Sequence, residues 1–371
     1  MTTYSDLNIT PRTLMGPGPS DVAPRVLRAL AHPPVGHLDP QFVKVMDEVQ
    51  ELLRFIFETT NEMTIPISGT GSAGMEAAVA NFIETGDPVL ICINGYFGMR
   101  IAEMAERYGA EVTRIEKPWG EVFAPEDVDA ALRRRSAKIV AMVHGETSTG
   151  AMQPLDGMAE VVHGHGGLLL VDTVASLGGV PVSVDRHALD IVYSGSQKAL
   201  SAPPGLAPLT VSPRALEALK RRESKVANWY LDLNLLANYW GPARMYHHTA
   251  PINMNYALRE ALRLAQEEGL EAGFARHRAN AEFLWAGLEE MGMQMHVAHE
   301  VRLPTLTTVR VPDGVDEAAV RSRLMNEFNL EIAGGLGALK GQVWRVGLMG
   351  YSSQHRNVTL FLGALREVLA G

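Results

Sequence analysis

Lys198 and Asp172 are the two residues whose types and positions most clearly suggest chemistry. Lys198 follows the apolar run 191–193 and stands among small residues, a setting that suits neither a core nor a solvated surface. Asp172 comes at the end of the preceding apolar run, 168–171. Parallel sheets bind ligands at the carboxyl ends of their strands. We therefore expect the two side chains to face one site.

An amine and a carboxylate at one site are what a pyridoxal phosphate enzyme needs. The Lys198 amine can form an imine with the cofactor aldehyde, and Asp172 can keep the pyridine nitrogen protonated so that the ring accepts electrons. Lys198 must be partly deprotonated to attack, which burial near other cations achieves. Asp172 alone could simply cap the following turn, but the pair favours the cofactor.

A glycine-rich loop, residues 68–74, lies between an apolar run and a helical pattern. Such a loop directs backbone N–H groups and a positive helix end at one point and so binds phosphate. Gly69, Gly71 and Gly74 also match the dinucleotide fingerprint, which leaves a nicotinamide-dependent oxidoreductase as a distant alternative. That fingerprint needs an acidic residue at the end of the next strand, where Asn94 stands instead. A plain tight turn is the third interpretation.

Arg345 lies in a short apolar run, 343–347, and its planar fork suits bidentate capture of a substrate carboxylate. A structural salt bridge is the alternative. We find no second arginine in a comparable setting, which favours small monocarboxylic substrates. The polar segment 144–150 follows another strand and offers hydroxyls to a cofactor. The paired histidines at 163/165 and 247/248 lack further ligands at metal spacing, so we expect no metal.

Alternating strand and helix patterns predict an α/β fold with a mostly parallel sheet covered by helices on both faces. We divide the chain into an N-terminal arm (1–13), a large domain (14–268) and a smaller α+β domain (269–371), with Gly269 at the boundary. The predicted strands are 63–67, 89–93, 111–115, 138–143, 168–171, 190–193 and 207–211, followed by 305–311 and 343–348. The predicted helices include 40–59, 72–84, 98–108, 125–135, 155–165, 255–290, 316–328 and 353–369.

The composition is that of a globular enzyme. The 371 residues carry a net charge of −9, which argues against nucleic acid or an anionic membrane as the main partner. No apolar run is long enough to span a membrane, and no signal peptide is evident, so we expect a cytoplasmic protein. The single cysteine, Cys92, lies in a predicted strand and excludes a disulfide framework.

These segments together resemble the class V pyridoxal phosphate-dependent aminotransferases, and within them the alanine–glyoxylate and serine–glyoxylate aminotransferases. The resemblance covers nearly the whole chain. Its most specific parts are the lysine segment 193–200 and Tyr246-His247-His248-Thr249. The remaining segments that carry it are 16–20, 68–71, 144–146, 171–179, 334–337 and 344–348.

The resemblance implies fold type I and a set of site residues. Lys198 and Asp172 would be catalytic, with Lys198 also moving protons. Tyr246 and Thr249 would reach the phosphate of a neighbouring subunit, which implies a homodimer with shared active sites. The implied cofactor-binding residues are Ser68, Gly69, Thr70, Gly71, Phe97, Thr147, Asp172, Val174, Gln197, Lys198, Tyr246 and Thr249, and the implied substrate-binding residues are Arg345 and Gly18.

The sequence departs from the family pattern at three of these positions. Phe97 stands where tryptophan often stacks on the cofactor ring; it keeps a π face but loses area and the N–H. Thr70 and Thr147 replace serine and keep the hydroxyl.

The expected reaction is transamination of alanine or serine with glyoxylate, giving glycine and pyruvate or hydroxypyruvate. Serine–pyruvate or another class V aminotransferase, such as one with an aminophosphonate donor, is the alternative. A cysteine desulfurase would need a loop cysteine, which Cys92 does not provide.

Overall fold

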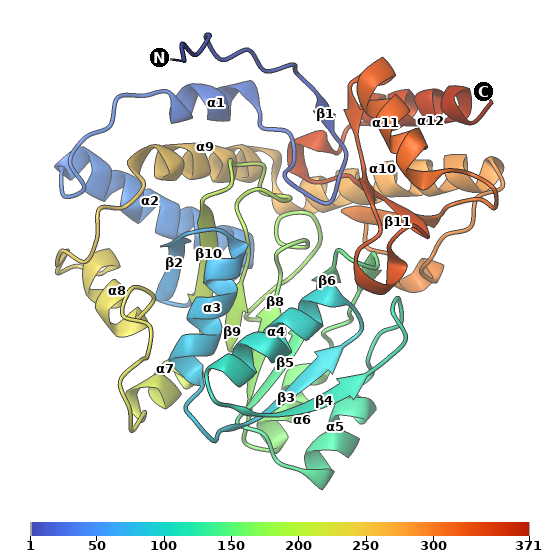
Figure 1. Ribbon diagram of the computed structural model, residues 1–371. Helices are drawn as coiled ribbons and strands as arrows, with labels where there is room; N and C mark the ends of the chain where they lie inside the picture. Colours follow the sequence, from blue (N-terminus) through green and yellow to red (C-terminus); the bar gives the residue numbers. More distant parts are fainter. Residues whose placement is uncertain (1, 371) are drawn as a thin grey trace.

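The computed structural model describes residues 2–370 and is built around a seven-stranded sheet in the order β2-β10-β9-β8-β5-β3-β4 (Figure 1). Neighbouring strands are parallel except at β10, which is antiparallel to both β2 and β9. The predicted mostly parallel sheet is confirmed. Its strands are Met63–Ser68 (β2), Pro88–Ile93 (β3), Glu111–Glu116 (β4), Ile139–Val143 (β5), Leu168–Asp172 (β8), Ile191–Tyr193 (β9) and Leu206–Val211 (β10).

Both faces of the sheet are apolar, and helices cover both. On β5, Ile139, Ala141 and Val143 pack into one hydrophobic cluster, whereas Val140 and Met142 pack into another. Burial on both faces is typical of parallel sheets. The first cluster includes residues of α3 (Gly71–Phe82), α4 (Tyr96–Arg107), α7 (Pro213–Lys220) and α8 (Leu233–Trp240); the second includes α5 (Pro125–Arg134), α6 (Met158–Gly164) and α9 (Ile252–Glu268).

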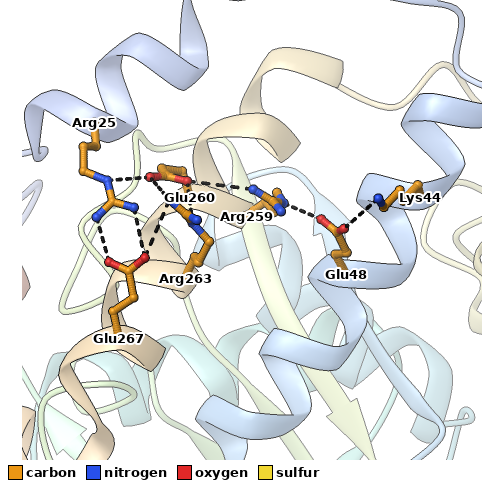
Figure 2. Close-up of polar contacts among 7 residues, drawn as sticks. All are labelled: Arg25, Lys44, Glu48, Arg259, Glu260, Arg263 and Glu267. Atoms are coloured by element: carbon orange, nitrogen blue, oxygen red, sulfur yellow. Dashed lines mark hydrogen bonds and ion pairs between the residues drawn. The ribbon is translucent and has the colours of Figure 1, made fainter.

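Helices α1 (Pro24–Leu30) and α2 (Pro40–Phe57) pack along α9. Asp39 caps α2 by accepting a hydrogen bond from the backbone N–H of Gln41 at 2.8 Å, and proline occupies the first helical position. Ion pairs then connect the three helices across their polar faces (Figure 2). The connected residues are Arg25, Lys44, Glu48, Arg259, Glu260, Arg263 and Glu267.

The C-terminal part has its own small sheet, β11-β14-β13, formed by Leu306–Arg310 (β11), Ala333–Gly334 (β13) and Val343–Gly347 (β14). Helices Leu270–Glu290 (α10), Glu317–Phe328 (α11) and His355–Ala370 (α12) pack around it. Their hydrophobic cluster begins at Ala281 and also contains Met15. We propose the predicted boundary at residue 268, with residues 13–15 packed against the C-terminal domain.

Two pairs of short strands lie outside the two larger sheets. Strand β1 (Thr13–Leu14) pairs in parallel with β12 (Leu330–Glu331), and β6 (Gly145–Glu146) pairs with β7 (Ala151–Met152). Three single turns of 3₁₀-helix lie at 299–301, 337–339 and 350–352. Within residues 2–370, no helix has the length and apolarity that crossing a membrane requires.

Candidate active site

A cavity of about 200 Å³ opens at the carboxyl ends of β5 and β8, beside the first turns of α3 and α4. Lys198 and Asp172 both face it, as expected from their positions at strand ends. Its wall is formed by Thr70, Gly71, Ser72, Met75, Phe97, Arg100, Val143, Gly145, Thr147, Asp172, Val174, Ala175, Gln197 and Lys198.

Asp172 is buried at the base of this cavity with both carboxylate oxygens engaged. Oδ1 accepts the Val174 backbone N–H at 2.8 Å, and Oδ2 accepts the Tyr193 hydroxyl at 2.7 Å. Burial raises the pKa of Asp172 to about 6, although these donors and the charge of Lys198 oppose the rise. The carboxylate can therefore hold a proton or stabilise a cation near neutral pH.

Lys198 lies under the loop that leads in from the N-terminus. Its ammonium donates a hydrogen bond to the Pro17 carbonyl. A Cβ at Gly18 would lie 2.7 Å from the Lys198 Nζ, so only glycine leaves room for the amine. Burial lowers the pKa of Lys198 to about 8, assisted by the charges of Arg345 and Arg100 and opposed by Asp172. A useful fraction of the amine is thus neutral near neutral pH.

The start of α3 lines the cavity and presents a helix N-terminus to it. Thr70 precedes the helix without capping it through its side chain. A Cβ at Gly71 would approach Val174 to 3.3 Å. Among residues 2–370, the buried Oε1 of Gln197 is left without a hydrogen-bond partner. Since amide oxygen and nitrogen can exchange places, Gln197 has capacity to donate to an anion at this helix end.

Two of the predicted cofactor-binding residues, Ser68 and Gly69, do not form part of the cavity wall. The Ser68 hydroxyl lies 2.7 Å from Nε2 of His248, and the Ser68 carbonyl accepts a hydrogen bond from Tyr230 at 3.3 Å. Gly69 lies behind, with its N–H bonded to the carbonyl of Gly205 at 3.0 Å. Their predicted contact with a cofactor stays a prediction, whereas Thr70 and Gly71 do line the cavity.

Phe97 and Arg100, one helical turn apart on α4, both line the cavity. The Arg100 guanidinium lies 4.8 Å from the centre of the Phe97 ring. Arg100 thus brings a guanidinium to the cavity from a helix, a setting unlike that of Arg345 and one that sequence reasoning did not consider. The sequence pattern located the helix but did not show which of its faces meets the cavity.

Arg345 is buried beside the cavity, not on its wall. Its Nε donates to the Gly334 carbonyl at 2.7 Å, and Nη1 donates to the Thr147 carbonyl at 3.1 Å. Burial lowers the pKa of Arg345, and Glu146 opposes that effect. These two bonds orient the guanidinium while leaving other N–H groups for a substrate.

Tyr246 and Thr249 are exposed, and neither lines the cavity of its own chain. The Tyr246 ring lies 5.0 Å from that of His37. Among the described residues 2–370, no three His, Cys, Asp or Glu side chains gather as a metal-binding group.

Comparison with known proteins gives this arrangement its context. The family model for aminotransferase class-V matches residues 25–358. The chain belongs to the class V aminotransferases. A crystal structure of alanine–glyoxylate aminotransferase from Nostoc sp. superposes with a TM-score of 0.98 at 56% identity, covering 99% of this chain and 98% of that one.

Two relatives of this class V aminotransferase carry different names. The (S)-ureidoglycine–glyoxylate transaminase of Bacillus subtilis is 43% identical, over 96% of this chain and 90% of its own. The alanine–glyoxylate aminotransferase of Rattus norvegicus is 42% identical, over 98% of this chain and 89% of its own. The fold is fold type I, as predicted, and the enzyme is pyridoxal phosphate-dependent.

The cavity fits this cofactor on its own chemistry. It offers a lysine with a lowered pKa, a buried carboxylate, a helix N-terminus and the unpartnered Gln197 oxygen. Sequence reasoning missed Tyr193, which was hidden in an apolar run, and Arg100. It also assigned no role to Glu146, a fully buried carboxylate in the turn after β5. The available signal was an acidic residue directly before the expected cofactor-facing Thr147, in a polar segment that follows a strand.

Proposed function

We propose that this enzyme transfers the amino group of a small amino acid, alanine or serine, to glyoxylate. The observation that carries the proposal is the closeness of Arg345 to Lys198. The Arg345 guanidinium is buried, is oriented by two hydrogen bonds, and lies near enough for its charge to lower the pKa of the Lys198 amine. Such a pair would hold the carboxylate of a small amino acid while the amine reaches its α-carbon. The alanine–glyoxylate names of similar proteins support it.

We propose that each part of the cofactor contacts a different set of residues. Thr70, Gly71 and Gln197 would bind the cofactor phosphate at the start of α3, Asp172 would pair with the pyridine nitrogen, and Val174 would pack on the ring. When bound, the cofactor supplies an electron sink for the α-carbon of the substrate. Phe97 would contact the opposite ring face, and Thr147 would face the cofactor hydroxyl.

The proton transfer would belong to Lys198. With a pKa of about 8, its Nζ can take the α-proton of the amino acid and later return one, since both forms of the amine are accessible near neutral pH. Gly18 and Pro17 would cover the amine and limit water access, since the Pro17 carbonyl is its hydrogen-bond acceptor.

(S)-Ureidoglycine is a second candidate donor, because the 43% identical relative from Bacillus subtilis is named for it. Arg100 adds a third group of candidates, since a second guanidinium at the cavity could accept the side-chain carboxylate of aspartate or glutamate.

A single-turnover donor screen tests these options. The cofactor-loaded enzyme is mixed with alanine, serine, (S)-ureidoglycine, aspartate or an aminophosphonate, and the loss of its yellow colour is timed, with glyoxylate and pyruvate then compared as acceptors. Alanine or serine should react fastest, and glyoxylate should restore the colour fastest. A faster reaction with (S)-ureidoglycine, aspartate or an aminophosphonate would overturn the assignment of alanine or serine as donor.

We also propose a homodimer in which Tyr246 and Thr249 complete the neighbouring site. Large apolar side chains are exposed at both ends of the segment 229–246, where Trp229 is 62% and Tyr246 64% exposed. Tyr246→Phe should leave the dimer intact by light scattering and weaken pyridoxal phosphate binding. An unchanged affinity, or a monomeric protein, would contradict this proposal.

A further inference from the structure

Helix α4 begins without a cap of its own. Its N-cap residue is Gly95, which has no side chain to accept the first N–H groups of the helix. These N–H groups are normally satisfied by a side-chain oxygen at the N-cap position. In α4 the two earliest ones belong to Tyr96 and Phe97, and Phe97 lines the cofactor cavity.

The cap comes from another strand end, the turn at Glu146. Oε2 of Glu146 accepts the Phe97 N–H at 3.0 Å. Oε1 accepts both the N–H of Ser148 at 3.0 Å and its hydroxyl at 2.6 Å, and the same hydroxyl accepts the Tyr96 N–H at 2.9 Å. Both helix N–H groups are therefore bonded to side chains of the 146–148 turn.

The sequence of the helix start is fitted to this remote cap. A Cβ on Gly95 would collide with the Glu146 side chain, so a conventional Ser or Asp cap cannot stand there. Glu146 is fully buried, and a buried carboxylate is stable only when its oxygens are hydrogen-bonded. Burial raises its pKa, and the donors from Ser148 and Phe97 oppose that rise.

The turn itself is rigidly placed. Glu146 pairs with Ala151 in the β6–β7 hairpin, and its carbonyl accepts the Gly150 N–H at 2.8 Å. Gly150 is in turn bonded to Leu303 at 2.9 Å. Thr147 lies between the two capping residues, and its carbonyl accepts a hydrogen bond from the Arg345 guanidinium. The buried turn 146–148 thus forms hydrogen bonds both with the start of α4 and with Arg345, the proposed substrate-binding arginine.

We propose that Glu146 is a positioning residue: as a cap supplied from outside the helix, it sets the place of Phe97 on the cofactor ring. The proposal rests on the proposed contact of Phe97 with the cofactor. Glu146 needs no contact with the cofactor itself, because it acts through the N–H of the ring-bearing residue.

Glu146→Gln tests the cap, because an amide must turn its NH₂ group toward either Phe97 or Ser148, both donors. Binding of pyridoxal phosphate alone to the apoprotein should weaken about tenfold or more, the usual effect of losing a hydrogen bond to a charged group. Amide hydrogen exchange of peptides spanning residues 94–104 should accelerate in the same apoprotein.

Asp190→Asn is the matched control. Asp190 is also a buried carboxylate with three partners, Leu169, Ser212 and His163, but it precedes β9 and so lies at the amino end of that strand, away from the cavity. Its loss should lower thermal stability while leaving the affinity for pyridoxal phosphate and the exchange of 94–104 unchanged.

A double-mutant cycle with Phe97→Leu shows whether Glu146 acts through the ring. If it does, Glu146→Gln should cost little further affinity once Phe97 is leucine. Should Glu146→Gln fail to fold, Ser148→Ala replaces it in the cycle, since that change removes the Tyr96 cap and leaves the carboxylate. Additive losses, unchanged affinity in Phe97→Leu, or unchanged exchange at 94–104 would each overturn the proposal. The readout contains no amino donor, so an error in the donor assignment does not affect it.

Discussion

The hydroxyl of Tyr193 donates a hydrogen bond to Oδ2 of Asp172 at 2.7 Å, between two residues that are direct register partners on β9 and β8. Both side chains are buried. With Val174 bonded to the other oxygen, the carboxylate plane is held from two sides. The residue that would meet the cofactor nitrogen is thus oriented by a tyrosine that does not line the cavity.

Tyr193→Phe should therefore weaken cofactor binding without unfolding the protein. The ring still fills its place, but the carboxylate loses one donor, which is worth about 1.5–3 kcal/mol for a charged acceptor. We expect roughly tenfold weaker pyridoxal phosphate binding by titration of the apoprotein, and a higher pKa for Asp172. An affinity equal to that of the wild type would show that the Val174 N–H alone suffices.

The pKa of Lys198 predicts how cofactor capture depends on pH. Only the neutral amine attacks the aldehyde, so the association rate of pyridoxal phosphate should rise with pH and level off above about 8. An unperturbed lysine would give a midpoint near 10.4. Arg345→Met should move the midpoint upward, because it removes a cation that disfavours the ammonium.

Stopped-flow absorbance over a pH series measures this rate. Arg323→Met, on α11 and paired with Glu327, is the control for losing an arginine from the same part of the chain, and its midpoint should stay near 8. A wild-type midpoint near that of free lysine would contradict the proposed environment of the amine.

Asp172→Asn should stabilise the cofactor-free protein. The folded pKa of about 6 exceeds the ordinary 3.8, so ionised Asp172 costs about 3 kcal/mol of folding free energy once the pH is above 6. The cost shrinks as pH falls from 6 toward 3.8 and disappears below that value, where Asp172 is protonated in both states. Melting temperatures of the two apoproteins should therefore differ at pH 7.5 and converge near pH 4. A variant that melts lower at pH 7.5 would refute this.

Gly18→Ala should separate folding from cofactor attachment. The added Cβ would lie within 3 Å of three Lys198 side-chain atoms, so the amine must move from its place under Pro17. We expect a folded protein that stays colourless or takes up pyridoxal phosphate at least tenfold more weakly. Gly86→Ala is matched for backbone strain, since both glycines have positive φ, but its Cβ would meet no neighbour, and it should stay yellow.

The sequence predicts most of the elements and the central pair of the site. The carboxyl ends of parallel strands lie on the same side of a sheet, which is why the sequence alone predicted that Asp172 and Lys198 face one site. The antiparallel direction of β10 was not predictable, because a strand buried on both faces has the same apolar pattern in either direction. Glu146 and Arg100 were missed for another reason: their roles depend on which way a turn and a helix face.

The pairing of β1 with β12 has a consequence for the order of events during folding. Arg12 donates a hydrogen bond to the Met325 carbonyl across 313 residues, and Met15 accepts one from Gly347 at 2.7 Å. Residues 12–15 thus bond to the segments at 325–331 and at Gly347, contacts of very high sequence separation that require a long loop to close. The loop that covers Lys198 is anchored by those contacts, so we expect the cover over the amine to be completed late in folding, after the strands of the C-terminal domain have formed.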